Sequence, residues 1–233
     1  MPADFMESLA AAQLSAALAE HGMALRGGFR VTAADDLPDP APGRQARALL
    51  LVGNVGGAMW PAFAAARDGG TGANPMDNWT RRVIDPIAGQ VGALALYPFV
   101  GPPYFPFQRW AMRAEAVAPS PLMILIHPVH GLWHAYRAAL VLADDCDLAP
   151  VPAAPIPCET CADRPCLRAC PVAAFTATGF ADRTCASHVD GPNGGDCREG
   201  GCLARRACPV GQDLAYPPAQ MAFHMEAFLS RRR

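Results

Sequence analysis

Apolar positions in the first part of the chain recur with two periods, one typical of helices and one typical of buried strands. Residues 5–22 place Phe5, Leu9, Leu14 and Leu18 among many alanines, and Gly22 follows them. This pattern predicts an amphipathic helix that ends at the glycine. Short aliphatic runs bounded by Gly, Asn or Pro are typical of buried strands. The strand candidates are residues 46–54, 91–99, 122–128 and 131–143.

Helical patterns also occupy residues 74–90, residues 107–118 and the tail at 217–233. In the first of these, Asp77 or Asn78 is expected to cap the helix N-terminus. The segment "GNVGGAMW" at 53–60 lies between a strand and a helix, but it departs from the G-x-G-x-x-G phosphate-binding pattern. A tight turn is the better interpretation of it. The order of helices and strands predicts a layered α+β domain, with an α/β arrangement left open.

Length and charge narrow the classes of protein. The chain has 233 residues, 52% of them hydrophobic, which suits one large domain or a domain with a small appendage. A formal net charge of -2 gives no sign of nucleic-acid or anionic-membrane binding. No run approaches the ~18 apolar residues of a membrane span, and "MPADFMESLA" lacks a signal-peptide pattern. We therefore expect a cytoplasmic protein, in which cysteines bind metal more often than they form disulfides.

The nine cysteines are concentrated in the last third of the chain. The first 145 residues contain none, Cys146 comes next, and eight lie between Cys158 and Cys208. The segment "LAPVPAAPIP" is uncharged and rich in Pro and Ala, which is typical of an extended linker. We expect Cys146 to be a buried thiol outside any metal site. The expected divisions are an α+β domain with a cofactor or partner pocket over 1–147, a linker over 148–157, a cysteine-rich module over 158–212, and a C-terminal helix and tail over 213–233.

The spacing of the eight later cysteines indicates two 4Fe–4S clusters. They form two groups of four, and the last cysteine of each group precedes a proline, as Cys170-Pro171 and Cys208-Pro209. In two-cluster ferredoxins the proline-flanked cysteine binds the cluster of the other group. The spacing here is looser than the usual Cys-x2-Cys-x2-Cys-x3-Cys-Pro. The crossing pattern predicts one cluster on Cys158, Cys161, Cys166 and Cys208, and the other on Cys170, Cys185, Cys197 and Cys202.

These cysteines allow three other interpretations. Two zinc sites would also use eight cysteines, although zinc ligands usually come as two well-separated pairs. A disulfide framework conflicts with a reducing compartment. A catalytic Cys-x-x-Cys pair would leave the remaining cysteines without a purpose. Iron–sulfur clusters are therefore preferred, and zinc is the main alternative.

The residues from about 105 to 210 are similar to the middle and late part of the epoxyqueuosine reductases. The likeness is carried by "LMILIHPVHGLWHAYRAALVLADDCDLAPVPAAPIPCETCADRPCLRACPVAAF", "DRTCASH" and "GGCLARRACPVG". "IHPVHGLWHAYRAALVL" also resembles the matching strand pair of the cobalamin-processing protein mutated in methylmalonic aciduria type C, a relative without clusters. The resemblance implies a nitroreductase-like α+β N-terminal domain beside a small ferredoxin-like double-cluster module. It also implies a site for cobalamin or flavin near "IHPVHGLW", with His127 beside the corrinoid.

Two features separate the chain from those reductases. The segment "YPFVGPPYFPFQRW" at 97–110 contains no Asp or Glu where the reductases carry the acidic residue proposed for epoxide opening. The chain is also shorter than the reductases and lacks the C-terminal repeats that contact tRNA in them. We therefore do not expect epoxyqueuosine reduction itself, while another oxidoreductase activity stays open.

His127, His130 and His134 are also close together in the sequence. No nearby carboxylate completes a metal site, so local hydrogen bonds are the expected role of these histidines. The preferred prediction is an electron-transfer protein or reductase component with two 4Fe–4S clusters and a redox partner protein. One alternative is a corrinoid- or flavin-dependent reductase with the clusters as its internal electron relay. The other is a non-redox zinc-binding protein, and no catalytic residue is assigned in any of the three.

Overall fold

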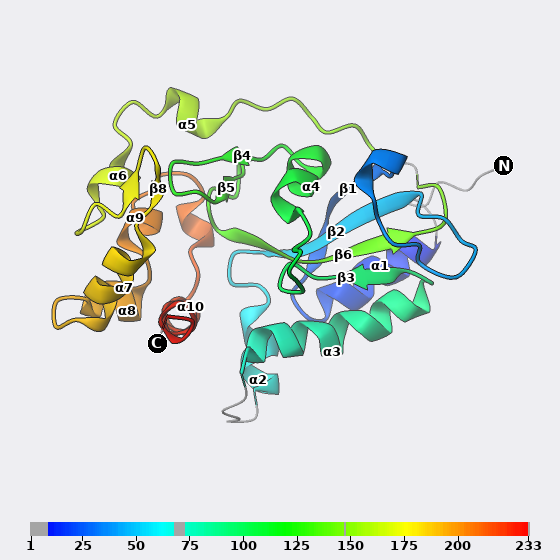
Figure 1. The fold of residues 1–233 in the computed structure, drawn as a ribbon, viewed down its shortest axis with the longest axis horizontal. Helices are drawn as coiled ribbons and strands as arrows, with labels where there is room; N and C mark the ends of the chain where they lie inside the picture. The colour runs from blue at the N-terminus through cyan, green and yellow to red at the C-terminus, as the bar shows by residue number, and fades with distance from the viewer. Residues whose placement is uncertain (1–8, 68–72, 147, 233) are drawn as a thin grey trace. The chain divides into compact units, whose positions relative to one another are not determined.

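The structure is a computed structural model that describes residues 9–67, 73–146 and 148–232 (Figure 1). The chain separates into two compact units. Unit 1 comprises Met1–Ala116 and Ala135–Ala153, and unit 2 comprises Val117–His134 and Ala154–Arg233. No helix among the described residues is long and apolar enough to cross a membrane.

The centre of unit 1 is a four-stranded sheet with strand order β1-β2-β6-β3. Its strands are β1 (Ala24–Arg30), β2 (Ala48–Val55), β6 (His134–Leu142) and β3 (Leu94–Leu96). The β1–β2 and β3–β6 pairs are antiparallel, which confirms the α+β class. The two central strands carry the aliphatic runs that predicted them, and Leu49, Leu51, Leu140 and Val141 are fully buried there. Such runs suit strands that are covered on both faces.

Four α-helices accompany this sheet among the described residues of unit 1. They are α1 (Leu9–Ala19), α2 (Trp60–Ala66), α3 (Pro75–Gln90) and α4 (Phe107–Ala114), with a short 3-10 turn η2 (Ala33–Asp35). The apolar face of α3 supplies Trp79 and Ile84 to the core, and α4 packs against β1. The segment between β2 and α2 is a turn with Gly56 at a φ of 53°, as the sequence predicted.

One expectation for the helices is confirmed over the described residues, and two need correction. The predicted helix over 5–22 is confirmed from Leu9 to Ala19, and residues 5–8 lie outside the described residues. The cap of α3 is Asn74, in the left-handed conformation at a φ of 54°, and not Asp77 or Asn78. The helix predicted over 107–118 ends at Ala114, because Glu115 turns extended and directs its carboxylate to Arg26.

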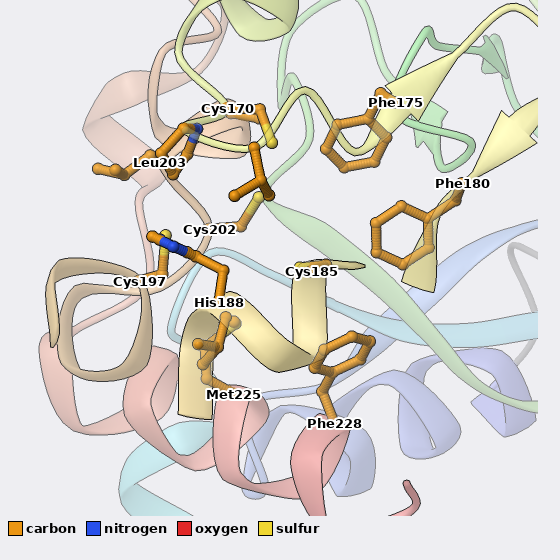
Figure 2. Close-up of a pocket in the computed structure, with 14 residues that line it drawn as sticks. Cys170, Phe175, Phe180, Cys185, His188, Cys197, Cys202, Leu203, Met225 and Phe228 are labelled. Carbon is orange, nitrogen blue, oxygen red and sulfur yellow. The ribbon is translucent and has the colours of Figure 1, made fainter. Parts of the chain in front are cut away.

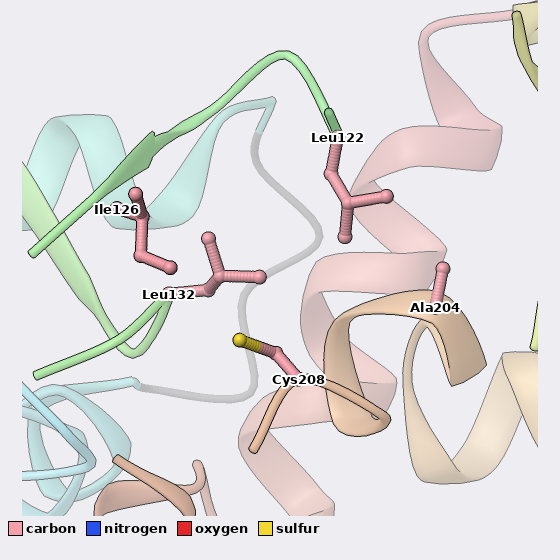
Figure 3. Close-up of a cluster of buried hydrophobic side chains, with 5 residues drawn as sticks. All are labelled: Leu122, Ile126, Leu132, Ala204 and Cys208. Carbon is pink, nitrogen blue, oxygen red and sulfur yellow. The ribbon is translucent and has the colours of Figure 1, made fainter. Parts of the chain in front are cut away.

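Unit 2 is built from short elements. They are the hairpin β4 (Ala118–Pro119) and β5 (Leu125–Ile126), α5 (Pro157–Thr160), α6 (Pro165–Arg168), the hairpin β7 (Phe175–Thr176) and β8 (Gly179–Phe180), α7 (Asp182–Asp190), α8 (Gly195–Gly200), α9 (Leu203–Arg206), η3 (Gln212–Leu214) and α10 (Pro218–Ser230). The α10 helix, predicted in the tail, packs against α7 and α8. A second core forms where Leu122, Ile126 and Leu132 meet Ala204 and Cys208 (Figure 3).

The structure differs from the sequence-based division in residues 117–134. These residues were predicted to belong to the domain before the linker, whereas they belong to the cysteine-rich unit. Gly131 shows how closely they pack there. It has a φ of 57°, and a Cβ at this position would lie 1.9 Å from the carbonyl oxygen of Val210. Only glycine therefore fits this contact.

Candidate metal centres

Four of the eight clustered cysteines line one cavity of unit 2, which we call cavity A. They are Cys158, Cys161, Cys166 and Cys208. The first three come from α5, α6 and the loop between them, and Cys208 follows α9. The cavity has a volume of about 270 Å³, and its other lining residues are four prolines, Thr160, Arg164, Ile126 and Val210.

The other four cysteines line a second cavity, which we call cavity B. They are Cys170, Cys185, Cys197 and Cys202. Cavity B has a volume of about 180 Å³ and a largely aromatic and aliphatic wall. Figure 2 shows the Phe175 and Phe180 rings on one side of it, and Met225 and Phe228 of α10 on another.

The structure thus brings the eight cysteines together in the two sets of four that the crossing pattern predicts. Their interleaving has a local cause in the two prolines. Each of the short helices α6 and α9 ends two residues before a Cys-Pro pair. A residue before proline is disfavoured in the helical conformation, so the chain leaves the helix at Cys170 and at Cys208. Cys170 therefore lines the cavity of the second cysteine group, and Cys208 lines the cavity of the first.

Backbone amides point at sulfur atoms in both cavities. In cavity B, the Ala174 N–H donates to the Cys170 Sγ at 3.3 Å, and the amides of Ala204 and Arg205 donate to Cys202. In cavity A, the Leu167 amide donates to Cys166 and the Val210 amide to Cys208. Such hydrogen bonds favour the thiolate, which is the form that binds metal.

Burial works against the thiolate at the same residues. It raises the pKa of Cys185 to about 11, and the neighbouring cysteines of cavity B add to that rise. In cavity A, burial followed by the charge of Cys208 raises the pKa values of Cys158 and Cys166. Four thiolates therefore cannot share either cavity unless a cationic group compensates their charge.

Four cysteine sulfurs are the ligand set of a 4Fe–4S cluster and also of a structural zinc site. Each cavity therefore has the donor set of a thiolate-bound metal group. Among the described residues, no group of three His, Cys, Asp or Glu side chains is arranged to hold one metal ion.

The segment 117–134 contributes directly to cavity A. Pro121 and Ile126 line it, and the Cys208 sulfur points toward Leu132 (Figure 3). Arg205, between the cysteines Cys202 and Cys208, holds this segment in place. Its guanidinium donates to the Leu132 carbonyl at 3.1 Å and lies 4.6 Å from the Trp133 ring and 4.5 Å from the Tyr216 ring. No local sequence pattern predicts these contacts of Arg205, because the residues involved are far apart in the chain.

The three histidines make the local contacts expected for them. The His127 Nδ1 accepts hydrogen bonds from the Val129 and His130 amides at 3.1 Å, and the His127 and His130 rings stack at 4.0 Å. The His134 Nε2 lies 3.1 Å from the Leu125 carbonyl oxygen. Cys146 is fully buried, as expected, and burial raises its pKa to about 11, which disfavours the thiolate form.

Unit 1 contains a polar group that the sequence analysis did not identify. The buried Arg26 makes two hydrogen bonds to the Glu115 carboxylate, at 2.6 and 2.8 Å, and a third to the Asn54 carbonyl. The Tyr136 hydroxyl donates to Glu115 at 2.7 Å, and burial followed by the Glu115 charge raises the pKa of Tyr136. Glu115 lies just beyond the segment 97–110, in which the sequence analysis found no acidic residue. Its carboxylate is already engaged by Arg26 and Tyr136.

Comparisons by sequence find no relatives, because no protein-family model and no curated protein matches the chain. Comparisons by fold find solved structures with a similar fold. An epoxyqueuosine reductase crystallised with an epoxyqueuosine-modified tRNA-Tyr stem loop matches with a TM-score of 0.52 and 12% identity, over 89% of this chain and 66% of the reductase. A selenomethionine-labelled epoxyqueuosine reductase matches with a TM-score of 0.54 and 12% identity, over 92% and 68%.

A third solved structure covers nearly the whole of both chains. It is the C. elegans B12-trafficking protein CblC, a homologue of human MMACHC, with a TM-score of 0.52 and 14% identity over 94% of this chain and 96% of that one. The chain spans about two-thirds of the length of the reductases. At these identities the likeness shows the fold, and it shows no activity or ligand.

Proposed function

We propose that this chain is an iron–sulfur electron-transfer protein, or the electron-transferring component of a reductase, with one 4Fe–4S cluster in each cavity. The observation that carries the proposal is the division of eight cysteines into two separate cavities of four, with ligands exchanged between the two Cys-Pro groups. When bound, each cluster would supply a one-electron carrier. Cavity A would use Cys158, Cys161, Cys166 and Cys208, and cavity B would use Cys170, Cys185, Cys197 and Cys202.

The protein's own residues would contribute three things to such clusters. The thiolates compensate the charge of the metal atoms, the amide N–H groups stabilise those thiolates, and the apolar walls keep water away. The small Ala174 and Ala204 side chains let the backbone approach the sulfurs closely. The fold likeness to epoxyqueuosine reductase supports the proposal at the level of the fold.

The decisive experiment is metal analysis of protein purified without oxygen. We expect about eight iron and eight sulfide per chain, with visible absorbance that dithionite bleaches. Two zinc ions and no iron would refute the proposal in favour of the zinc alternative. The Cys208→Ala variant tests the ligand sets. It should lose the cluster of cavity A and retain the other, whereas loss of only the cavity B cluster would show that the sets are wrong.

A second candidate is a corrinoid-dependent reductase in which the clusters pass electrons to a corrinoid. It is favoured by the likeness to the B12-trafficking protein, which extends over nearly all of both chains. Cobalamin added to the reduced protein should then shift its absorption spectrum and co-elute with the protein on gel filtration. If cobalamin does neither, this candidate is excluded while the electron-transfer proposal stands. The same two measurements with flavin test a flavin-dependent variant.

A further inference from the structure

The two cavities differ in the charge of their walls. Among the described residues that line cavity A, Arg164 is the one charged side chain beside the cysteines. Cavity B has no arginine in its wall, and His188 is its one ionisable residue apart from the cysteines. An arginine is charged at every working pH, whereas a histidine is charged only when it is protonated.

The position of Arg164 is set by its backbone. It has a φ of 39°, in the left-handed region, and it precedes the proline that begins α6. This conformation brings its side chain into the wall of cavity A, two residues before Cys166.

Two arginines lie beside cavity B without lining it. Arg198 donates to the carbonyl of the wall residue Val189 at 2.9 Å. Arg232 lies near Cys185, and its guanidinium pairs with Asp182 at 3.1 Å and donates to the Phe228 carbonyl. The Asp182 carboxylate therefore offsets part of the charge of Arg232. No ion pair is seen for Arg164 among the described residues, so its charge acts on cavity A without such compensation.

A charge of this kind changes the free energy of adding an electron. Reduction makes a cluster more negative by one unit, which a nearby cation favours and an apolar wall disfavours. Hydrogen bonds to sulfur act in the same direction as the cation, and three are found at each cavity among the described residues. They therefore favour neither cavity, and the difference between the cavities lies in Arg164 and in the more polar wall of cavity A.

We propose that Arg164 gives the cluster in cavity A the higher reduction potential, so that a single electron on the protein rests in cavity A. The inference builds on the proposed function. The electron then rests beside Pro121 and Ile126, in the segment 117–134 that covers cavity A. An electron delivered to the cluster in cavity B then passes to the cluster of higher reduction potential in cavity A. An electron acceptor would receive it by binding at the segment 117–134.

The test is a redox titration followed by electron paramagnetic resonance, at pH 8.5 so that most histidines are neutral. The variant is Arg164→Asn, because asparagine accepts the left-handed conformation and removes the charge. Arg168→Asn is the matched control, since Arg168 ends the helix that Arg164 precedes, is exposed as Arg164 is, and does not line cavity A. Arg164→Lys keeps the charge. The cluster of cavity A is identified by the signal that Cys208→Ala removes.

We expect two midpoints in the native protein, the higher one belonging to cavity A. Arg164→Asn should lower that midpoint alone, and the other two arginine variants should leave both midpoints in place. Equal midpoints, a higher midpoint in cavity B, or an unchanged midpoint in Arg164→Asn would each overturn the inference. Should Arg164→Asn assemble poorly, added salt offers a second test on the native protein. Screening should then lower the midpoint of cavity A more than that of cavity B. Iron and sulfide are measured first, so protein without clusters refutes the proposed function and is not mistaken for a failure of Arg164.

Discussion

The buried ion pair between Arg26 and Glu115 allows a sharp test of unit 1. The Arg26 side chain is 3% exposed and the Glu115 side chain 14% exposed, and two short hydrogen bonds join them. The substitution Glu115→Gln keeps the size of the side chain and an acceptor for Tyr136, but it removes the charge. The guanidinium of Arg26 is then left buried without a counter-charge.

The expected loss is large because Arg26 cannot reach water. Removing one partner of a buried pair costs about 3–5 kcal/mol of unfolding free energy. Replacing the whole group by apolar residues, as in Arg26→Met with Glu115→Leu and Tyr136→Phe, should cost less, because no polar atom of the three is left unsatisfied. The exposed pair of Arg44 and Asp144, joined at 2.9 Å, is the matched control in the same unit. For Asp144→Asn we expect a loss of at most about 1 kcal/mol.

Urea denaturation followed by tryptophan fluorescence measures these losses. Three of the four tryptophans, Trp60, Trp79 and Trp110, belong to unit 1, so the signal reports mainly on that unit. A shift of the midpoint at constant slope gives the change in free energy. The expected cost of the buried charge is refuted if Glu115→Gln lowers the unfolding free energy no more than Asp144→Asn does. It is also refuted if the triple replacement lowers the unfolding free energy more than Glu115→Gln does.

Three further predictions concern single positions. Cys146→Ala should leave the iron and sulfide content unchanged, because this buried thiol belongs to neither cavity; a drop in iron content would place it among the ligands. Gly131→Ala should sharply reduce cluster content, because its Cβ would lie 1.9 Å from a carbonyl oxygen, whereas Gly92→Ala, at a φ of 65° in open space, should cost only about 1–2 kcal/mol in urea denaturation. Burial and a neighbouring carboxylate raise the pKa of Tyr97, so the folded state keeps a proton that the unfolded state loses above about pH 10. Unfolding free energy should therefore fall as the pH rises beyond 10, and Tyr97→Phe should make that fall less steep in denaturation series at several pH values.

Elements with a strong local pattern could be predicted from the sequence, and elements without one could not. The buried run of β2 and the periodic apolar face of α3 were predicted nearly in full. Strand β1 was missed because its centre is Gly27-Gly28, which carries no hydrophobic signal. Only glycine nonetheless fits at position 28, since a Cβ there would lie 2.6 Å from the Leu49 carbonyl oxygen of β2. The reason for this glycine lies in its neighbour strand, which a single segment does not reveal.

The candidate site shows the same division between local and distant information. Proline-flanked cysteines are a local signal, and they predicted which cysteines line a cavity together. The segment 117–134 has no such signal for its place beside the cysteines. Its attachment depends on Gly131 against Val210 and on Arg205 against the Leu132 carbonyl, contacts between residues more than seventy positions apart. The position of the Arg164 charge in the wall of cavity A likewise depends on a left-handed backbone conformation that no local sequence pattern predicts.

The order of the ligands also implies that the two cavities do not depend on each other equally. Along the chain, Cys166 and Cys208 of cavity A bracket all four cysteines of cavity B. Closing cavity A therefore means closing a long loop, and the entropy cost of closure is smaller when that loop is already folded. A cluster in cavity B would fold it, by fixing α7, α8 and the start of α9. Cys202→Ala should then deplete both clusters, whereas Cys208→Ala should deplete one. Equal and independent losses of iron in the two variants would show that the chain between Cys166 and Cys208 is folded without metal.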